Sequence, residues 1–370
     1  MPLLDLEKSR EVASEFDKYV HNGLALYNDC QTEHLSVTDY FEKLDPSEKD
    51  LNGKMIAPID ALERHLLAKE VNLYGPNALT VAQLSDRVEY VMPELVLREI
   101  KLGMEVAPKY SYKDIVAMTV PNSGIHYHPL YIPELNNKSA TARRDKSAGT
   151  RTSIGKGGNF PVLSIRNRVK DIVVEDIGRV IETAYSVIKD HGWADFAILL
   201  RLIGGQMAAD KLQNIYDLAI TGDGSVGAAR NTFTGVAGTL GYTDLVINET
   251  DYESPFTMNT MLCPQQSIRT ILVMAQFQDP QAGWDYQRTG QLVTPMGAKL
   301  KQVDPTPGST PTGTIMITMD KNFAVKEVVS EILAVEAEKI IQRKFEAAVV
   351  SEQSTFSIIA DGALRRIIWT

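Results

Sequence analysis

The glycine-rich segments of the sequence contain two patterns that could bind phosphate groups, and neither is complete. Lys156 is followed by Gly157, whereas a phosphate-binding loop needs Ser or Thr directly after its lysine. Gly235, Gly238 and Gly241 follow a GxxGxxG spacing instead of the GxGxxG of dinucleotide-binding loops, and no clear strand precedes them. We therefore interpret these residues as turn-forming glycines and expect no cofactor.

Two further patterns could supply metal ligands or a nucleophile. His126 and His128 lie two residues apart on a predicted strand and so share a face, but the nearby sequence offers no third ligand. The SxxK pattern of penicillin-recognising enzymes occurs at Ser153 and at Ser186, without the SDN and KTG motifs that accompany it in those enzymes. We expect no catalytic residue, no metal ligand and no enzymatic activity.

The charge of the chain is distributed unevenly. Residues 1–60 carry 13 Asp and Glu against 6 Lys and Arg, a net charge of −7, whereas residues 138–170 carry nine basic residues against Asp145, a net charge of +8. No Phe, Tyr or Trp lies within residues 134–159, which disfavours binding of single-stranded nucleic acid, because its bases stack on aromatic rings. A nucleic-acid footprint, an arm that docks on an acidic surface of another copy, and a solvated loop are the three interpretations of this segment. Its central basic residues are Lys138, Arg143, Arg144, Lys146, Arg151 and Lys156.

The composition limits the class of protein. The chain has 370 residues, of which 44% are hydrophobic and 23% charged, so it is long enough for two or three globular domains at about 150 residues each. Cys30 and Cys263 are too far apart to form a zinc motif or a disulfide framework, which indicates a reducing compartment. No run of residues approaches the ~18 apolar positions that a membrane-spanning helix needs. The N-terminus becomes acidic before any stretch typical of a signal peptide.

Hydrophobic spacing predicts helices in the first hundred residues and strands after them. The predicted helices cover residues 58–75, 80–93 and 94–101, and each is too short to be stable without a packing partner. The predicted strands cover residues 115–120, 125–132, 160–165 and 171–174. They flank the basic segment on both sides, so we expect an arm that runs out and back as two strands with a basic tip.

The rest of the chain begins with the longest helical pattern, at residues 191–220, in which Gly204 and Gly205 are expected to cause a bend. Residues 225–320 predict a compact α/β domain, with strand-like runs at 245–247 and 315–319 and a helix at 264–277. Strands are predicted in the tail at residues 323–329, 345–350 and 356–359.

This order of elements resembles the major capsid proteins of tailed bacteriophages, which have the Hong Kong ninety-seven-like fold. Residues 154–161, followed by 178–183, are similar to the returning side of the family's extended loop and its entry to the peripheral domain. Residues 212–225 are similar to the end of its spine helix and the turn into its axial domain. Residues 295–297 and 312–325 are similar to the return from its axial domain. The resemblance covers about residues 105–370.

The resemblance implies an α+β fold in an L-shaped subunit. Its expected parts are an N-terminal helical arm at residues 1–110, an extended loop with flanking strands at 111–178, a peripheral domain with the spine helix at 179–224, an axial domain at 225–320, and peripheral return strands at 321–370. The six central basic residues would then contact a neighbouring subunit. Some members of the family crosslink a loop lysine to an asparagine of the peripheral domain. Because Asn322 is the last asparagine, we expect no such crosslink.

The function implied by the resemblance is structural. Copies of the chain would assemble into hexamers and pentamers of an icosahedral shell that encloses double-stranded DNA, in a virion formed in the host cytoplasm. The expected partners are other copies of the chain, scaffolding and portal proteins, a decoration protein, and DNA held without sequence preference on the inner face, with no membrane. The alternatives are the shell of an encapsulin-like protein compartment and an unrecognised α/β enzyme.

Overall fold

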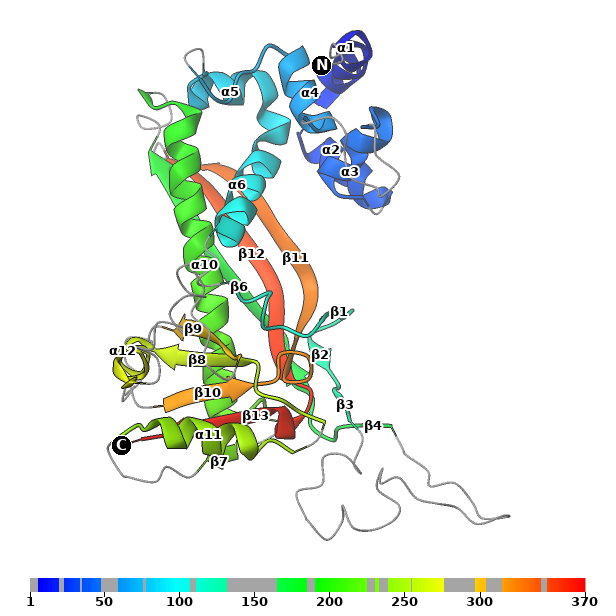
Figure 1. Cartoon of the computed structure of the whole chain (residues 1–370). Helices are drawn as coiled ribbons and strands as arrows, with labels where there is room; N and C mark the ends of the chain where they lie inside the picture. The colour runs from blue at the N-terminus through cyan, green and yellow to red at the C-terminus, as the bar shows by residue number, and fades with distance from the viewer. Residues whose placement is uncertain are drawn as a thin grey trace. The chain divides into compact units, whose positions relative to one another are not determined.

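The computed structural model describes residues 6–19, 23–33, 35–47, 59–75, 78–106, 111–131, 165–184, 190–224, 230–232, 239–253, 255–275, 297–303, 315–340 and 345–369. The chain divides into two compact units (Figure 1). The first unit consists of Met1–Val106, Gly178–Gly205 and Leu333–Ser351, and the second of Ala107–Ile177, Gln206–Ile332 and Glu352–Thr370.

Short helices form the N-terminal part of the first unit, as predicted. They are α1 (Leu6–Glu15), η1 (Phe16–Tyr19), α2 (Gly23–Thr32), α3 (Val37–Leu44), α4 (Ala61–Ala68), α5 (Val81–Val88), η2 (Glu89–Val91) and α6 (Met92–Val106). A buried aromatic cluster joins several of them: the rings of Phe16 and Phe41 stack with 4.4 Å between centroids, and His65 and Tyr90 lie against Phe16. These contacts supply the packing partners that helices of this length need.

Side-chain caps decide where these helices begin. The Thr80 hydroxyl accepts a hydrogen bond from the Gln83 N–H at 3.3 Å, and the Gln83 side chain accepts one from the Thr80 N–H at 3.1 Å, so the predicted start of α5 is confirmed. Asp60 caps α4 by accepting from the Glu63 N–H at 2.8 Å. The predicted end of this helix near residue 75 is wrong, because α4 already stops at Ala68.

The end of α4 contains a residue in the left-handed region, Glu70, at φ 57°. Its N–H donates to the Leu67 carbonyl at 3.0 Å, and the next N–H, of Val71, donates to Leu66 at 2.9 Å, which closes the last turn. Glycine adopts this conformation without the steric penalty that a side chain brings. We expect Glu70→Gly to raise the free energy of unfolding by up to about 1 kcal/mol, measured by urea denaturation. Glu70→Ala is the control and should give no gain; equal effects of the two substitutions would contradict this interpretation.

Helices α6 and α10 (Trp193–Thr221) cross closely within the first unit. A Cβ atom built on Gly204 would collide with the Ile100 carbonyl oxygen, and one on Gly103 with the Arg201 backbone, both well inside 3.0 Å. The predicted end of α6 at residue 101 is therefore wrong, because Gly103 permits the approach of another helix and does not stop its own. The predicted long helix at 191–220 is confirmed.

A four-stranded sheet has the order β1-β11-β12-β6. Its strands are β1 (Thr119–Pro121), β6 (Glu175–Ala184), β11 (Val325–Ile340) and β12 (Phe345–Ile358). Two long strands are observed in the tail, where three short ones were predicted. Strand β11 extends beyond the strand predicted at 323–329. Strand β12 joins the strands predicted at 345–350 and 356–359, because strand structure continues through the polar residues 351–355. Helix α10 and strands β6, β11 and β12 each contribute residues to both units.

A five-stranded mixed sheet in the second unit has the order β7-β13-β10-β8-β9. Its strands are β7 (Arg230–Thr232), β8 (Thr260–Pro264), β9 (Lys299–Val303), β10 (Ile315–Met319) and β13 (Leu364–Ile368), with η5 (Asp361–Ala363) directly before β13. The last strand of the chain thus pairs with strands from residues 230–319, between β7 and β10. Met261, Met316, Ile367 and Trp369 belong to one buried core with residues of two helices.

These two helices are α11 (Tyr242–Thr250) and α12 (Gln265–Val273). The helix predicted at 264–277 is confirmed as α12, but the strand predicted at 245–247 is wrong. The Asp244 carboxylate accepts a hydrogen bond from the Gly241 N–H at 2.9 Å, and Leu245 and Asn248 are buried at helical spacing. Capping and burial therefore outweigh the preference of the β-branched residues in this segment for a strand.

Candidate functional site

The root of the predicted arm is described, whereas its tip lies outside the described residues. All six candidate contact residues, Lys138, Arg143, Arg144, Lys146, Arg151 and Lys156, lie outside them. Strands β2 (His126–Tyr127) and β5 (Ile172–Val173) pair antiparallel, as do β3 (Leu130–Tyr131) and β4 (Arg166–Asn167). The predicted course of the arm, out and back as two strands, is confirmed at its root.

Large apolar side chains are exposed along this root. Ile165 is 70% exposed and Leu130 is 55% exposed, and Ile125, Val169 and Val173 are also more than half exposed. A two-stranded ribbon is marginally stable in water unless one of its faces is covered. The arm root therefore presents an apolar surface, next to the segment of highest positive charge, that can bind another surface.

A short polar contact lies between the two sides of the root. His126 Nδ1 is 2.5 Å from Asp171 Oδ2. A backbone hydrogen bond and the neighbouring His126 side chain hold the pKa of Asp171 below its ordinary value. Among the described residues, no group of three or more His, Cys, Asp and Glu side chains is placed to hold a metal ion.

A buried lysine connects α10 to the four-stranded sheet within the second unit. Lys211 Nζ donates to Glu352 Oε1 at 2.6 Å, to Glu327 Oε1 at 2.9 Å and to the Tyr112 hydroxyl at 3.2 Å. Burial lowers the pKa of the Lys211 ammonium, but the two carboxylates outweigh burial and raise it above its ordinary value. Lys211 is 3% exposed, so it stays charged in the core. This residue was not among the predicted site residues, although a single lysine among apolar positions of a long helix was the available signal.

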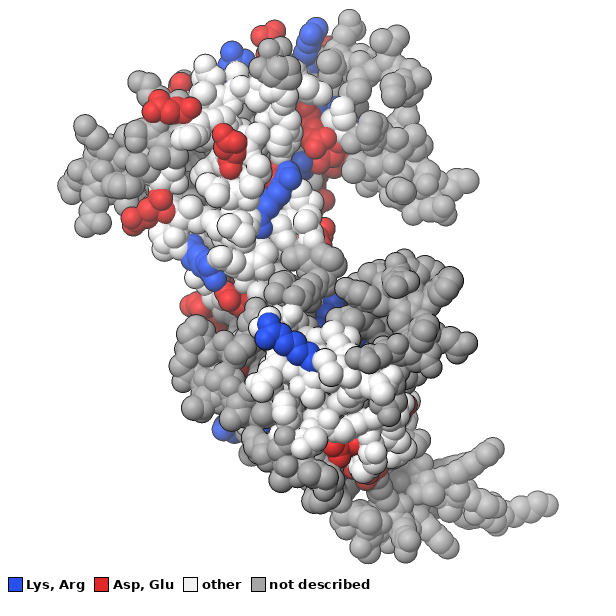
Figure 2. Space-filling view, turned by 60° about the vertical axis from the view of Figure 1, so that its left-hand side comes forward, with Lys and Arg blue, Asp and Glu red and all other residues white. Residues whose placement is uncertain are grey.

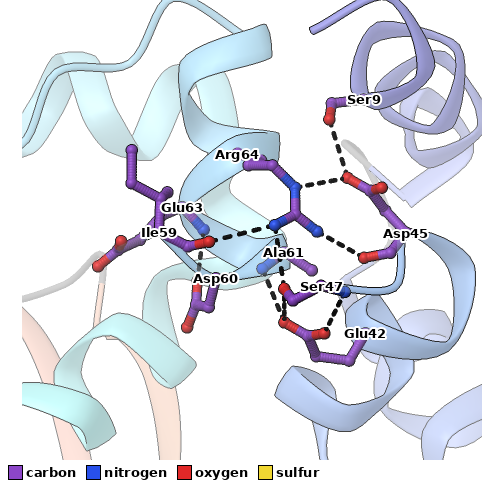
Figure 3. A network of polar contacts seen from close by, with 9 residues as sticks. All are labelled: Ser9, Glu42, Asp45, Ser47, Ile59, Asp60, Ala61, Glu63 and Arg64. Atoms are coloured by element: carbon purple, nitrogen blue, oxygen red, sulfur yellow. Dashed lines mark hydrogen bonds and ion pairs between the residues drawn. The ribbon is translucent and has the colours of Figure 1, made fainter. Parts of the chain in front are cut away.

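A second buried polar network joins three helices of the first unit (Figure 3). The Arg64 guanidinium donates through Nε to Asp45 Oδ2 at 2.9 Å and through Nη1 to the Ser47 hydroxyl at 3.0 Å. The Ser9 hydroxyl donates to the same Asp45 oxygen at 2.8 Å. Glu42 accepts from the N–H groups of Ser47 and Ala61, each at 2.9 Å. This network ties α1, α3 and α4 together.

The Glu42 carboxyl makes this network sensitive to acid. Burial raises its pKa, but the hydrogen bonds from Ala61 and Ser47 and the charge of Arg64 outweigh burial and hold the pKa below its ordinary value of 4.5. A carboxyl with a lowered folded pKa contributes stability above its unfolded pKa and loses that contribution as the pH falls through the folded value. We expect Glu42→Gln to melt at a lower temperature than the wild type at about pH 7 and to approach it at about pH 3.

Thermal melts followed by circular dichroism at several pH values test this expectation. Glu15→Gln is the matched control, because Glu15 is an exposed glutamate on α1. Its curve should follow the wild type. A Glu42→Gln curve parallel to the wild type across the acid range would contradict the role of Glu42.

Charged side chains are scattered on the face of the molecule shown in Figure 2. In the part of this face that the structure describes, Lys and Arg lie singly between uncharged residues, and no broad basic patch forms. A basic surface for nucleic acid is thus not found on this described face. No helix within the described ranges is long and apolar enough to cross a membrane.

Solved structures are similar to this chain, whereas no protein-family model and no curated protein matches it. The capsid of a native GTA particle matches with a TM-score of 0.50 and 11% identity, covering 71% of this chain and 90% of that chain. The capsid of an empty GTA particle gives the same values. The chain has the Hong Kong ninety-seven-like capsid fold. A structure from Microbacterium phage Oxtober96 has a TM-score of 0.48 and 13% identity, over 70% of this chain and 90% of that one.

The Hong Kong ninety-seven-like capsid fold agrees with the expected α+β class. The described residues include the long helix α10, the two-stranded root of the arm and the five-stranded sheet. Their assignment to the expected spine helix, extended loop and axial domain stays a prediction. The boundaries of the five expected parts and the contact role of the six basic residues stay predictions.

Proposed function

We propose that the chain is a structural protein that assembles with copies of itself into the hexamers and pentamers of an icosahedral shell. The observation that carries this proposal is its capsid fold, which extends over 90% of the GTA capsid chain. In a closed shell every copy is surrounded by other copies, so a surface that one subunit leaves uncovered can be covered by a neighbour. The exposed apolar side chains of the arm root are such a surface. The role is structural and not catalytic.

The shell is proposed to enclose double-stranded DNA in a virion formed in the host cytoplasm. The net charge of −9 favours weak contact with DNA, without sequence preference, on the inner face. Scaffolding, portal and decoration proteins are the further partners in this proposal. The chain is expected to enter particles without a covalent crosslink, so boiled particles should run as a single monomer band on a denaturing gel.

The contents of the particles test this proposal. The chain is expressed with its genomic neighbours, and sedimenting particles are treated with nuclease before their absorbance is recorded. Protected nucleic acid inside particles is the expected result. Particles that hold protein cargo and no nucleic acid would favour the compartment alternative, and a chain that never sediments as particles would contradict the shell function.

The basic tip of the arm is proposed to contact acidic surface on an adjacent subunit, including the N-terminal segment of net charge −7. Replacing Arg143, Arg144 and Lys146 together with Gln should weaken particles, because it removes three of the charges that attract the neighbour. The loss should be largest at low salt, where screening is weakest. Particle melting across a series of salt concentrations measures the effect.

A matched triple variant controls for the general change in charge. Lys101, Lys299 and Lys321 are exposed, and replacing all three with Gln removes the same charge elsewhere. This control should melt as the wild type does. Unchanged melting of the arm variant at every salt concentration would contradict the proposed contact.

A further inference from the structure

Arg168 is less exposed than the other residues of segment 165–170, on the returning side of the arm root. Ile165, Arg166, Asn167, Val169 and Lys170 are all exposed, whereas Arg168 is partly buried. A basic side chain turned toward the protein in an otherwise exposed segment needs specific partners, because burying a charge without them is unfavourable.

The partners of Arg168 come from two segments far apart in the sequence. Its N–H donates to the carbonyl of Pro129 on the outgoing side of the arm at 2.9 Å, and its guanidinium lies 5.7 Å from the centre of the Tyr131 ring. Its Nη2 donates to the carbonyl of Ile359, directly after β12, at 3.2 Å. All these residues belong to the second unit. The Arg168 backbone thus pairs with the outgoing strand of the arm, and its side chain joins Tyr131 of that strand to the end of β12.

Two carboxylates stabilise the charge at this junction. Burial is the larger effect and holds the pKa of the Arg168 guanidinium below its ordinary value, while Asp223, Asp361 and Tyr131 partly offset it. Asp223 follows the end of α10 and accepts a hydrogen bond from the Ile358 N–H at 2.9 Å. The end of α10, the end of β12 and the arm root therefore meet around one cation. An arginine keeps its charge at all physiological pH values, so this junction is not weakened by titration of the cation.

We propose that Arg168 is a positioning residue, which fixes the direction in which the arm leaves the second unit, and that assembly of the shell depends on this direction. The assembly part rests on the proposed function. Each copy must place its arm on the same site of its neighbour, so an arm that samples many directions binds less often. Arg166 offers a matched control, because it is an exposed arginine two residues away on β4.

A distance measurement between spin labels tests the positioning role in unassembled subunits. Labels are placed at Ile165→Cys on the arm and Thr221→Cys at the end of α10, two exposed positions of the second unit. The native cysteines, Cys30 and Cys263, are both buried. We expect Arg168→Ala to make the distance distribution about two-fold broader than the wild type, because the arm root loses its anchor. Arg168→Lys should give an intermediate width, since lysine keeps the charge but not the planar fork.

The same variants are then tested for particle yield. Arg168→Ala should lose most of its particles, while Arg166→Ala should match the wild type in both width and yield. Tyr131→Leu, which removes only the ring next to the guanidinium, is the second variant if Arg168→Ala does not fold, and it should also broaden the distribution.

The positioning role would be overturned if folded Arg168→Ala gave the same distance distribution as the wild type. If Arg168→Ala does not fold, an unchanged distribution in Tyr131→Leu would overturn it. A broadened distribution with normal particle yield would overturn the dependence of assembly on it. A wild-type chain that forms no particles would contradict the proposed function, and the distance distribution would then decide the positioning role by itself.

Discussion

Gly204→Ala is expected to lower the free energy of unfolding by about 3 kcal/mol, at the upper end of the usual effect of adding one methyl group to a packed interior. The added Cβ would collide with the Ile100 carbonyl oxygen. That oxygen belongs to the backbone of α6, which cannot move aside as a flexible side chain could. The two helices must therefore separate, and their contact within the first unit is lost.

A neighbouring glycine provides the control for this prediction. The nearest atom to a Cβ on Gly205 would be the Gly103 carbonyl oxygen at 3.8 Å, which is an ordinary contact. Gly205→Ala should be neutral or stabilising by up to ~1 kcal/mol, because alanine has the higher helix propensity. Gly103→Ala should destabilise as Gly204→Ala does. Urea denaturation of unassembled subunits distinguishes these outcomes, and equal stability of the variants at 204 and 205 would contradict the close helix crossing.

Lys211→Met is expected to lower the free energy of unfolding by about 3–5 kcal/mol, because it leaves buried carboxylates without their cation. Glu327 and Glu352 are 5% and 6% exposed, so water cannot replace the ammonium group. The raised pKa of Lys211 means that its contribution is complete at neutral pH and is lost only as the pH rises through the alkaline folded value. The destabilisation should be at least as large at about pH 8 as at about pH 6, because the unpaired buried carboxylates take up protons more readily at the lower pH.

A triple variant separates the loss of the cation from a general loss of packing. Replacing Lys211, Glu327 and Glu352 together with Met removes all three charges at similar side-chain volume. A buried ion cluster replaced in this way often gives a protein about as stable as the original. The triple variant should thus recover most of the free energy of unfolding that Lys211→Met loses. A mutant cycle that compares the wild type, the single variants and the triple variant measures this recovery. A triple variant less stable than Lys211→Met would contradict the assignment of the loss to unpaired carboxylates.

The predictable parts of this fold were those set by local sequence. The start predicted at Thr80 is the observed N-cap of α5, and the apolar spacing of residues 191–220 predicted one long helix, which is observed as Trp193–Thr221. Strand patterns on both sides of a polar, basic segment were enough to predict an arm, because such a segment has no core of its own. The arm root confirms that argument, through the pairs of His126 with Val173 and Leu130 with Asn167.

The parts that escaped prediction depend on contacts between segments distant in sequence. Gly103 lies 98 or more positions from the α10 residues that it meets, so its sequence neighbours indicate only a helix end. Lys211 was not singled out and Arg168 was counted only within the basic segment at 138–170, because their partners come from other elements, at residues 327, 352 and 359. Residues 245–247 were predicted as a strand because the β-branched Val246 and Ile247 favour one. The segment forms a helix instead, because Leu245 is buried in the core beside the sheet.

Electron microscopy of the purified chain, expressed alone and then with its genomic neighbours, tests the central claim most directly. We expect closed shells, or isolated hexamers and pentamers, under at least one of the two conditions. Monodisperse monomers or small oligomers under both conditions would contradict it, since a capsid fold that does not assemble would need another function.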